Sequence, residues 1–321
     1  MEERTGGIHS ISLPVPFPVG TVNVYLVDEE PITLIDTGVK SDDSLRVLKD
    51  SLGELGCPID SIRRILITHG HVDHYGQAKR ISAISGAQIF IHKNDFQRIR
   101  SMDQFWENLA PVLRQNGTPR DSLEGAIDYM KSAVRSLAEP PDDVCFIQDG
   151  DEICFEDLAL RSILCPGHSP GLLCFYLEKK GILISGDHLL SEISPNPIMD
   201  LKSEGAGPPS TSLKKYLDSI EKIRGLEVSL VLPGHGEPIQ GFPGALTKIL
   251  SHHEQRLSNL LSVLSMGEKT AYEISTALFP KARHFEVFLG VSEVLGHLRI
   301  LLDEGRIAWR SKNGLDYYAR T

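Results

Sequence analysis

Hydrophobic and polar residues alternate over the first forty positions in a way that predicts β-strands. The segments IHSISLP, TVNVYLVD and PITLIDTG are short apolar or alternating runs, and Pro, Gly and acidic residues separate them. Residues Asp42 to Leu55 then predict an amphipathic helix, because leucines recur there at helical spacing. Ser41 is placed to cap the start of this helix.

Strands and helices continue to alternate after this helix. The run RRILIT predicts a buried strand, Gln77 to Ser85 a helix, and QIFIH a further strand. From Asp95 to about Ala138 the pattern is helical and carries several aromatic residues, and it ends in the loop EPPDD. We therefore expect a helical insert of roughly residues 95–143 between two β-rich parts.

The β pattern returns beyond this insert. Strands are predicted at DEICFE, LALRSIL, LLCFYLE and GILISGD, and later at VSLVLPG, with helices at Lys214 to Arg224 and Ala245 to Leu264. This order of elements does not suit a simple doubly wound sheet. It favours an α+β fold in which two sheets are sandwiched between helices.

The pattern changes again after Met266. KTAYEISTALFP predicts a short helix, VFLGVSEVLGHLRILLDEG a longer one, and RIAWRSKNGLDYYA a hairpin that turns at Asn313-Gly314. Two helices followed by a two-stranded wing suggest a small winged-helix domain. The predicted domains are thus 1–243, a catalytic domain that includes the insert, and 244–321, a linking helix and a winged-helix-like C-terminal domain.

Composition narrows the setting in which this chain works. Its five cysteines form no CxxC pair, which makes a disulfide framework or a zinc finger unexpected and favours a reducing cytoplasm. Apolar runs are too short to span a bilayer, and the first residues lack the apolar segment of a secretory signal, so we expect no membrane association. The net charge of −10 argues mildly against a polyanionic partner.

The most informative segment is THGHVDHYG, which runs from Thr68 to Gly76 directly after a predicted buried strand. It contains His69, His71, Asp73 and His74. These residues cannot share one face of a helix, whereas alternate residues of a loop at a strand end can converge on one point, as metal ligands must. The carboxyl ends of strands are also where α/β-type layers usually place their chemistry.

Three later motifs repeat this placement at strand ends. PGHSPG presents His168, SGDH presents Asp187, and PGHGEP presents His235. Each lies in a turn that follows a β-rich stretch. A chance histidine-rich loop would not account for four motifs in this order, so the sequence predicts a metal site.

Taken together, these motifs resemble those of the metallo-β-lactamase fold superfamily of metal-dependent hydrolases. NVYLV and LIDTG also resemble that family's opening strands, with Asp36 as its structural aspartate, and the resemblance covers about Val22 to Gln240. It implies an αββα sandwich with two metals at one edge. The implied ligands are His69, His71 and His168 for the first metal, Asp73, His74 and His235 for the second, and Asp187 as the bridge between them.

The chemistry expected of this ligand set is metal-dependent hydrolysis. Imidazole and carboxylate suit zinc best here, with iron or manganese left open, so the expected cofactors are two divalent metal ions. Two cations that share a water lower its pKa from 15.7 towards ~7, and the resulting hydroxide attacks a carbonyl or phosphoryl centre. Asp73 is the predicted catalytic residue, because it can orient this nucleophile or move its proton.

The substrate is the open question at this point. The C-terminal tail resembles that of LACTB-2-like proteins, some of which are endoribonucleases acting on single-stranded RNA, and the catalytic half equally resembles glyoxalase II-type hydrolases. The acidic charge favours hydrolysis of a small-molecule ester or thioester. The alternatives are an endoribonuclease or phosphodiesterase and, with less support, a metal-binding protein without activity, because a complete ligand set favours an enzyme.

Several residues outside the ligand set also carry expectations. His188 is a candidate for a role behind Asp187, and the insert aromatics either pack in a core or form a lid. The tail is expected to be structural or to mediate a homodimer, with Arg306, Arg310 and Lys312 as the remaining candidates for nucleic-acid contact. The other histidines are expected to be structural or solvated: His9, His92, His252, His253, His284 and His297.

Overall fold

The computed structural model describes residues 7–17, 20–191, 195–199, 211–283 and 285–321, apart from the side chains of residues 121–124, 126 and 285. His284, one of the histidines expected to be structural, lies outside these residues. Contacts divide the chain into two compact units. The first comprises Met1–Arg100, Val134–Pro195 and Ile223–Ala245, and the second comprises Ser101–Ala133, Asn196–Lys222 and Leu246–Thr321. The domain boundaries expected from the sequence stay a prediction, because a grouping by contacts does not establish independent folding.

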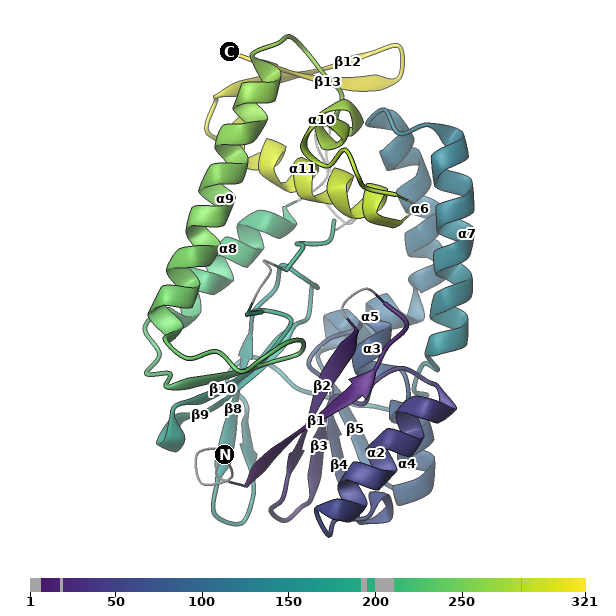
Figure 1. Cartoon of the computed structure of the whole chain (residues 1–321), viewed down its shortest axis with the longest axis vertical. Helices are drawn as coiled ribbons and strands as arrows, with labels where there is room; N and C mark the ends of the chain where they lie inside the picture. The colour runs from purple at the N-terminus through teal and green to yellow at the C-terminus, as the bar shows by residue number, and fades with distance from the viewer. Residues whose placement is uncertain (1–6, 18–19, 192–194, 200–210, 284) are drawn as a thin grey trace. The chain divides into compact units, whose positions relative to one another are not determined.

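The first unit contains a mixed sheet whose described strands follow each other in chain order (Figure 1). The first three pair antiparallel and the last four pair parallel, so that the third belongs to both arrangements. Its strands are β1 (Ile8–Pro14), β2 (Thr21–Val27), β3 (Thr33–Ile35), β4 (Arg64–Leu66), β5 (Gln88–Ile91) and β6 (Cys145–Phe146).

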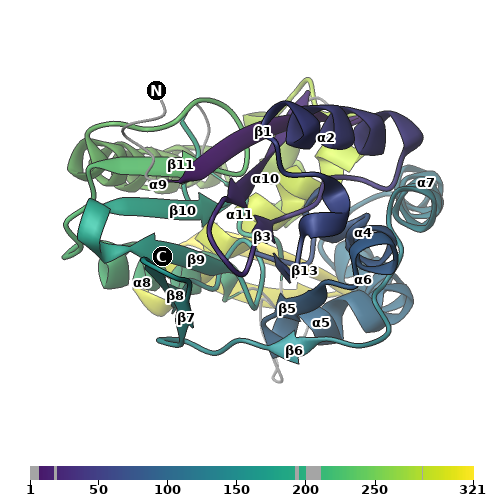
Figure 2. The same ribbon diagram turned by 90° about the horizontal axis from the view of Figure 1, so that it is seen from below.

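A second mixed sheet of the same unit faces the first (Figure 2). Its strands are antiparallel except for the last pair in the sequence, which is parallel. In sheet order they are β11 (Leu230–Pro233), β10 (Ile182–Gly186), β9 (Leu173–Leu177), β8 (Ala159–Leu164) and β7 (Glu152–Cys154).

One hydrophobic core joins the facing sides of these two sheets. Tyr25, Ile35 and Leu66 of the first sheet share it with Phe175 and Ile184 of the second. Every residue of β9 and β10 is buried, which explains why their sequences are continuous apolar runs rather than alternating ones. Two mixed sheets packed face to face agree with the predicted sandwich.

The other side of the first sheet carries helices. Leucines of α2 (Asp42–Glu54) and Ile81 of α4 (Ala78–Ser85) pack in a core with residues of β1, β2, β4 and β5. Ser41 caps α2 as predicted, since its hydroxyl accepts a hydrogen bond from the Ser44 amide at 3.0 Å. Short helices α3 (Val72–Tyr75) and α5 (Lys93–Arg100) follow β4 and β5.

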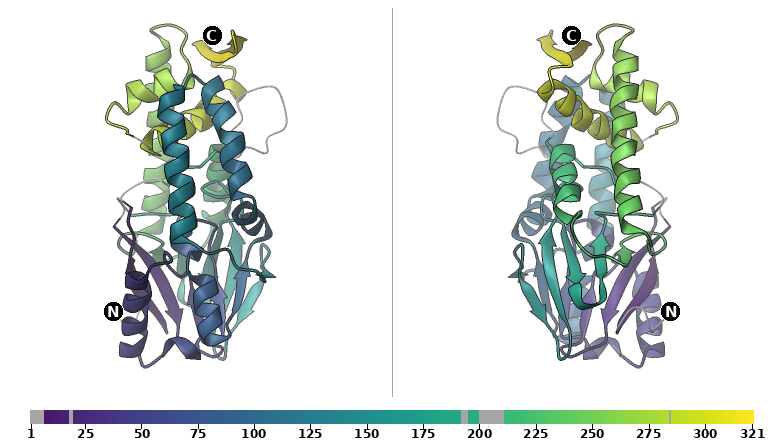
Figure 3. Two further views of the ribbon diagram at one scale, coloured as in Figure 1. Left: turned by 90° about the vertical axis from the view of Figure 1, so that its right-hand side faces the viewer. Right: turned by 90° about the vertical axis from the view of Figure 1, so that its left-hand side faces the viewer.

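The second unit is mainly helical (Figures 1 and 3). Its core includes Trp106, Leu260, Leu298 and Tyr318. Trp106 is 5% exposed, so it packs in a core, which is one of the two alternatives predicted for the insert aromatics. Tyr129, in contrast, is 65% exposed. The elements lying wholly or mostly in this unit are α6 (Met102–Gln115), α7 (Arg120–Leu137), α8 (Ser212–Ile223), α9 (Phe242–Leu264), α10 (Ala271–Leu278), α11 (Phe285–Asp303), β12 (Ile307–Lys312) and β13 (Leu315–Arg320).

The C-terminal hairpin turns where the sequence predicted. Asn313 and Gly314 have positive φ angles of 53° and 77°, which a two-residue hairpin turn of type I′ requires. α10 begins with a capping box formed by Thr270 and Glu273. These helices and the hairpin are observed, and their classification as a winged helix stays a prediction. Among the described helices, none combines the length and apolar character needed to cross a membrane.

Candidate metal centre

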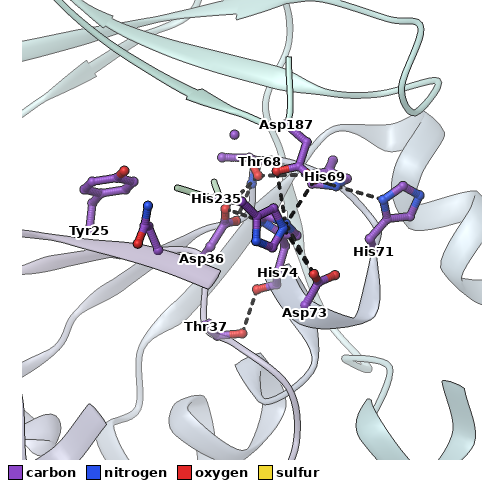
Figure 4. Close-up of polar contacts among 12 residues, drawn as sticks. Tyr25, Asp36, Thr37, Thr68, His69, His71, Asp73, His74, Asp187 and His235 are labelled. Carbon is purple, nitrogen blue, oxygen red and sulfur yellow. Dashed lines mark hydrogen bonds and ion pairs between the residues drawn. The ribbon is translucent and has the colours of Figure 1, made fainter. Parts of the chain in front are cut away.

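All seven predicted ligands belong to the first unit, and each group of them follows a strand. Figure 4 shows six of them side by side: His69, His71, Asp73, His74, Asp187 and His235. β4 leads into His69 and β8 into the turn with His168, while Asp187 and His235 follow β10 and β11. Within each described group of three, the possible ligand atoms lie within 4.8 Å of one another: His69, His71 and His168; His69, His74 and Asp187; Asp73, His74 and His235. The structure thus brings the seven side chains together, and their role as metal ligands stays a prediction.

The prediction that the histidine motif lies on a loop is wrong for its second half. The amides of His74 and Tyr75 both donate to the carbonyl of His71, at 3.0 and 3.1 Å, and this begins the one-turn helix α3. The sequence between two glycines was too short to show a helical period. Asp73 and His74 therefore reach the centre from a helical turn, whereas His69 and His71 reach it from the preceding loop.

Three imidazoles form the first group. The Nδ1 atom of His71 lies 3.0 Å from Nε2 of His69 and 2.9 Å from Nε2 of His168. Burial lowers the pKa of His69 and of His71 well below the ordinary value, so both rings are neutral at neutral pH. Neutral imidazole is the form that binds a metal.

Asp187 lies between this group and the second one. Its Oδ2 atom is 3.5 Å from Nε2 of His168 and 3.5 Å from Nε2 of His235, and its Oδ1 atom is 3.5 Å from Nε2 of His74. Asp73 completes the second group, with Oδ2 3.3 Å from Nε2 of His235. Oδ2 of Asp187 thus lies near one nitrogen of each group, which is the placement expected of a bridging ligand.

Asp36 fixes the ring orientation of two of these histidines. Nδ1 of His74 donates to Oδ2 of Asp36 at 2.8 Å, and the Thr68 hydroxyl donates to the same oxygen at 2.7 Å. That hydroxyl in turn accepts from Nδ1 of His69 at 3.1 Å, an assignment inferred from the hydrogen-bond network. Both Nε2 atoms therefore keep their lone pairs for the centre, and the prediction that Asp36 is a hydrogen-bonding scaffold residue is confirmed.

Strand β2 positions the last histidine. Nδ1 of His235 donates to the carbonyl of Thr21 at 2.6 Å, so that Nε2 again carries the lone pair. The Asn23 amide donates to the carbonyls of Pro233 and Gly236 at 3.1 and 2.8 Å, and this holds the turn that carries His235. Two strands that are distant in the sequence thus fix one imidazole.

The donor set fits divalent cations. In the described residues, Nε2 of His74 and Oδ1 of Asp187 are buried without a hydrogen-bond partner, as expected of atoms that are completed by a metal. Burial alone would lower the pKa of His235, but the carboxylates of Asp187 and Asp73 raise it to about 10. Burial opposes ionisation of Asp187, yet the neighbouring His74 and His235 hold its pKa well below the usual range. Imidazoles and carboxylates of this kind are ligands for zinc and similar ions.

Asp95 is a functional residue that the sequence analysis missed. It is fully buried on α5, and its Oδ2 atom accepts from the Gly70 amide at 2.8 Å and from the Ser169 hydroxyl at 2.6 Å. Its Oδ1 atom accepts from the Gly171 amide at 2.7 Å. One carboxylate therefore ties the loop of His69 and His71 to the turn of His168. The available signal was its position shortly after strand β5, the same placement that identified the ligands.

Replacing Asp95 by asparagine is expected to loosen both loops, because an amide NH₂ cannot accept the bonds that one of the carboxylate oxygens accepts. We expect Asp95→Asn to lower metal retention and kcat/KM roughly 10- to 100-fold, the usual effect of losing a residue behind a metal ligand. Metal analysis and steady-state rates check this. Asp151→Asn is the matched control, because Asp151 also accepts a backbone amide, that of Gln148 at 2.8 Å, but in an exposed loop. Equal behaviour of the two variants would contradict the assignment.

Gly234 leaves room for the bridging carboxylate. A Cβ atom at this position would lie 2.3 Å from Oδ1 of Asp187 and 2.8 Å from Cε1 of His74, which is closer than real contacts allow. We expect Gly234→Ala to displace one of these side chains and to reduce the metal content per chain. Gly225→Ala is the control, since its Cβ would meet no atom within 4 Å. A full metal complement in Gly234→Ala would show that the centre tolerates the shift.

The remaining histidines fall into two classes. Nε2 of His9 lies 3.9 Å from Oδ2 of Asp28, and Nδ1 of His92 accepts a hydrogen bond from the Asn94 backbone amide. His252 is exposed. All three agree with structural or solvated roles. His188 is buried next to Asp187, and a role behind that ligand stays a prediction. His253 and His297 instead belong to a separate buried group, which is described below.

Comparison with known proteins gives a consistent picture. The sequence profile described as "Metallo-beta-lactamase superfamily" matches residues 17–235. A probable metallo-hydrolase of Bacillus subtilis, YqjP, is 31% identical over 94% of this chain and 94% of its own length. A protein of Pseudocercospora fijiensis named as an atrochrysone carboxyl ACP thioesterase is 22% identical over 93% of this chain and 75% of its own length.

Solved structures extend the similarity to nearly the whole chain. A metallo-beta-lactamase family protein of Thermus thermophilus superposes with a TM-score of 0.85 at 29% identity, covering 98% of this chain and 99% of that one. The shared fold therefore includes the helices and the hairpin beyond the profile match.

Proposed function

Because the chain belongs to the metallo-beta-lactamase superfamily, we propose that it is a binuclear metal-dependent hydrolase that cleaves a small-molecule ester or thioester. The observation that carries the hydrolase assignment is the orientation of its imidazoles. His69, His74 and His235 each use Nδ1 for a partner in the protein and turn Nε2 towards the same centre. Five histidines and two aspartates around one point form a donor set for two cations, of which zinc fits best.

The chain's own residues supply binding and orientation in this mechanism. Bound divalent cations would supply Lewis-acid chemistry, since they lower the pKa of a water and stabilise developing negative charge. We assign one cation to His69, His71 and His168, the other to Asp73, His74 and His235, and the bridge to Asp187. Asp73 is 13% exposed at its side chain, more than the 9% of Asp187 and His235. We assign Asp73 the further task of holding the attacking water or accepting its proton.

One observation supports an acyl thioester substrate, and a second weakens the nucleic-acid alternative. One relative that aligns over most of this chain is named as a thioesterase of a carrier-protein-bound acyl group. In addition, two of the three basic residues that were candidates for nucleic-acid contact are paired with acids: Arg306 with Glu304 at 3.0 Å, and Arg310 with Glu268 at 2.8 Å. Arginines paired in this way are poorly available for phosphates, which nucleic-acid binding would need.

We also assign the C-terminal helices and hairpin a structural or homodimerising role, in a winged-helix-like arrangement similar to that of LACTB-2-like proteins. The buried residues of α11 are mostly apolar, among them Val291, Leu295 and Leu298, so this helix packs rather than presenting a polar face. A helix that reads nucleic acid would carry basic and amide side chains on an exposed face.

The direct test is a substrate panel on the purified, metal-analysed protein. We expect about two equivalents of divalent metal per chain and turnover of thioesters or esters, with little on lactones, aryl phosphodiesters or single-stranded RNA. Asp73→Ala and His168→Ala should each abolish this turnover, while His252→Ala, which removes an exposed imidazole, should retain it. Cleavage of RNA without acyl hydrolysis would replace the proposal by the nuclease alternative. Turnover that survives both variants would overturn the mechanism.

A further inference from the structure

A second group of metal-binding residue types lies in the other compact unit. His253 of α9 and Glu293 and His297 of α11 offer ligand atoms that all lie within 4.8 Å of one another. The three residues are 2%, 7% and 0% exposed. Glu293 and His297 are four positions apart, so they share one face of α11. Packing of apolar side chains alone does not explain why two imidazoles and a carboxylate are buried together here.

The hydrogen bonds of His297 determine which of its nitrogens faces the group. Nδ1 of His297 donates to the backbone carbonyl of Glu293 at 2.7 Å, so Nε2 carries the lone pair. This Nε2 lies 3.1 Å from Nδ1 of His253. Two nitrogens bound to one zinc at about 2.0–2.1 Å can be at most about 4.2 Å apart, and the observed separation satisfies that limit.

The protonation states agree with this geometry. Burial lowers the pKa of His253 to about 3 and that of His297 to about 4, so both imidazoles are neutral at neutral pH, as metal ligands must be. Glu293 offers the third ligand atom of the same group, and burial raises its pKa to about 7, so a bound cation would hold its carboxyl in the ionised form.

We propose that His253, Glu293 and His297 form an auxiliary site for a single Zn²⁺-like cation, separate in sequence and in structural unit from the hydrolytic centre. Two histidines and one glutamate leave a fourth position for water in a tetrahedral zinc site. The cation would connect α9 to α11 and so cross-link the two helices. From the sequence, both histidines were expected to be structural or solvated. The proposal instead makes them ligands of a metal ion.

Arg256 limits the affinity of this site. Its Nε atom lies 3.6 Å from Oε1 of Glu293, and its guanidinium lies over the ring of Phe279 at 4.6 Å. The arginine balances the buried carboxylate when no cation is bound, and its positive charge opposes a cation when one is. The auxiliary site therefore binds more weakly than the centre built on Asp73 and Asp187, and the two sites fill in sequence as metal is added.

Titration of a full-length variant without the hydrolytic centre tests the proposal. In the background His69→Ala, His235→Ala and Asp187→Asn, which removes one ligand from each group and the bridging carboxylate, we expect Zn²⁺ to bind with one equivalent per chain by calorimetry, and Co²⁺ to give the visible absorption of a tetrahedral site. Adding Glu293→Gln, which preserves shape, should weaken binding at least tenfold. His252→Gln is the control, because this neighbouring imidazole is exposed.

The outcomes separate this proposal from the proposed function. Absence of saturable Zn²⁺ and Co²⁺ binding in the background variant overturns the auxiliary site, and so does binding that Glu293→Gln leaves unchanged. Circular dichroism confirms that each variant is folded. Failure of the wild-type protein to hydrolyse acyl substrates bears on the hydrolytic centre alone.

Discussion

Asparagine in place of Asp187 is expected to cause the largest loss of activity of any single isosteric change in this chain. The carboxylate lies within 3.5 Å of Nε2 atoms of His74, His168 and His235, and it is the only described carboxylate placed towards both groups of ligands. An amide of the same shape keeps one weak oxygen ligand and loses the charge. We expect kcat/KM to fall by more than the roughly 10- to 100-fold that the loss of a residue behind a ligand causes.

The measurement for Asp187→Asn combines metal content with rates. We expect at most one tightly held metal ion at the centre, since the two groups no longer share a bridging anion. Asp151→Asn, on an exposed loop of the same unit, is the control and should keep both metal and activity. Wild-type rates in Asp187→Asn would remove the bridging role from the mechanism.

Acidification is expected to release metal from the centre, because protons and cations compete for the same nitrogens. Without a cation, the pKa of His235 is raised to about 10 and that of His74 is raised well above the ordinary value. In both cases burial opposes protonation, and the surrounding carboxylates, Asp187 foremost, outweigh it. At neutral pH the metal-free protein therefore carries protons at positions that the metal needs.

Only the neutral form of an imidazole binds a metal. At every pH below the raised pKa of His235, lowering the pH therefore favours the protonated, metal-free protein. For each proton that the metal must displace, the apparent metal affinity falls about tenfold when the pH falls by one unit, since one unit of pKa corresponds to about 1.4 kcal/mol. Calorimetry at pH 6, 7 and 8, in buffers of different ionisation enthalpy, measures both slope and proton release. An affinity independent of pH over this interval would falsify the raised pKa values.

Much of the centre could be predicted from sequence because its ligands obey a local rule. His168, Asp187 and His235 each lie directly after an apolar strand, and they were identified because their motifs and the histidine cluster support one another. Asp36 was identified from the resemblance of LIDTG to the opening strands of the family, and it follows β3. The order of strands, helical insert and further strands also predicted two sheets sandwiched between helices, whereas the parallel or antiparallel pairing of the strands was not predicted.

What the sequence did not show depends on contacts between distant residues. Asp95 accepts hydrogen bonds from groups 25, 74 and 76 positions away, and apart from its position shortly after β5 its sequence neighbourhood resembles that of a surface acid on a helix. Likewise, the pairing of His253 with His297 crosses 44 positions and two helices. The grouping of residues 101–133 and 196–222 with the C-terminal part arises from packing alone.

The contacts of Asp95 also bear on how the protein acquires its metal. Since the carboxylate links the loop of Gly70 to the turn of Ser169 through protein atoms alone, the two loops are held in register before any ion arrives. We therefore expect the chain to fold without a metal ion and to take one up in a separate step. On the proposed function, the metal available at that step would then decide which ion the centre holds, so that the same chain could give enzyme forms with different metals.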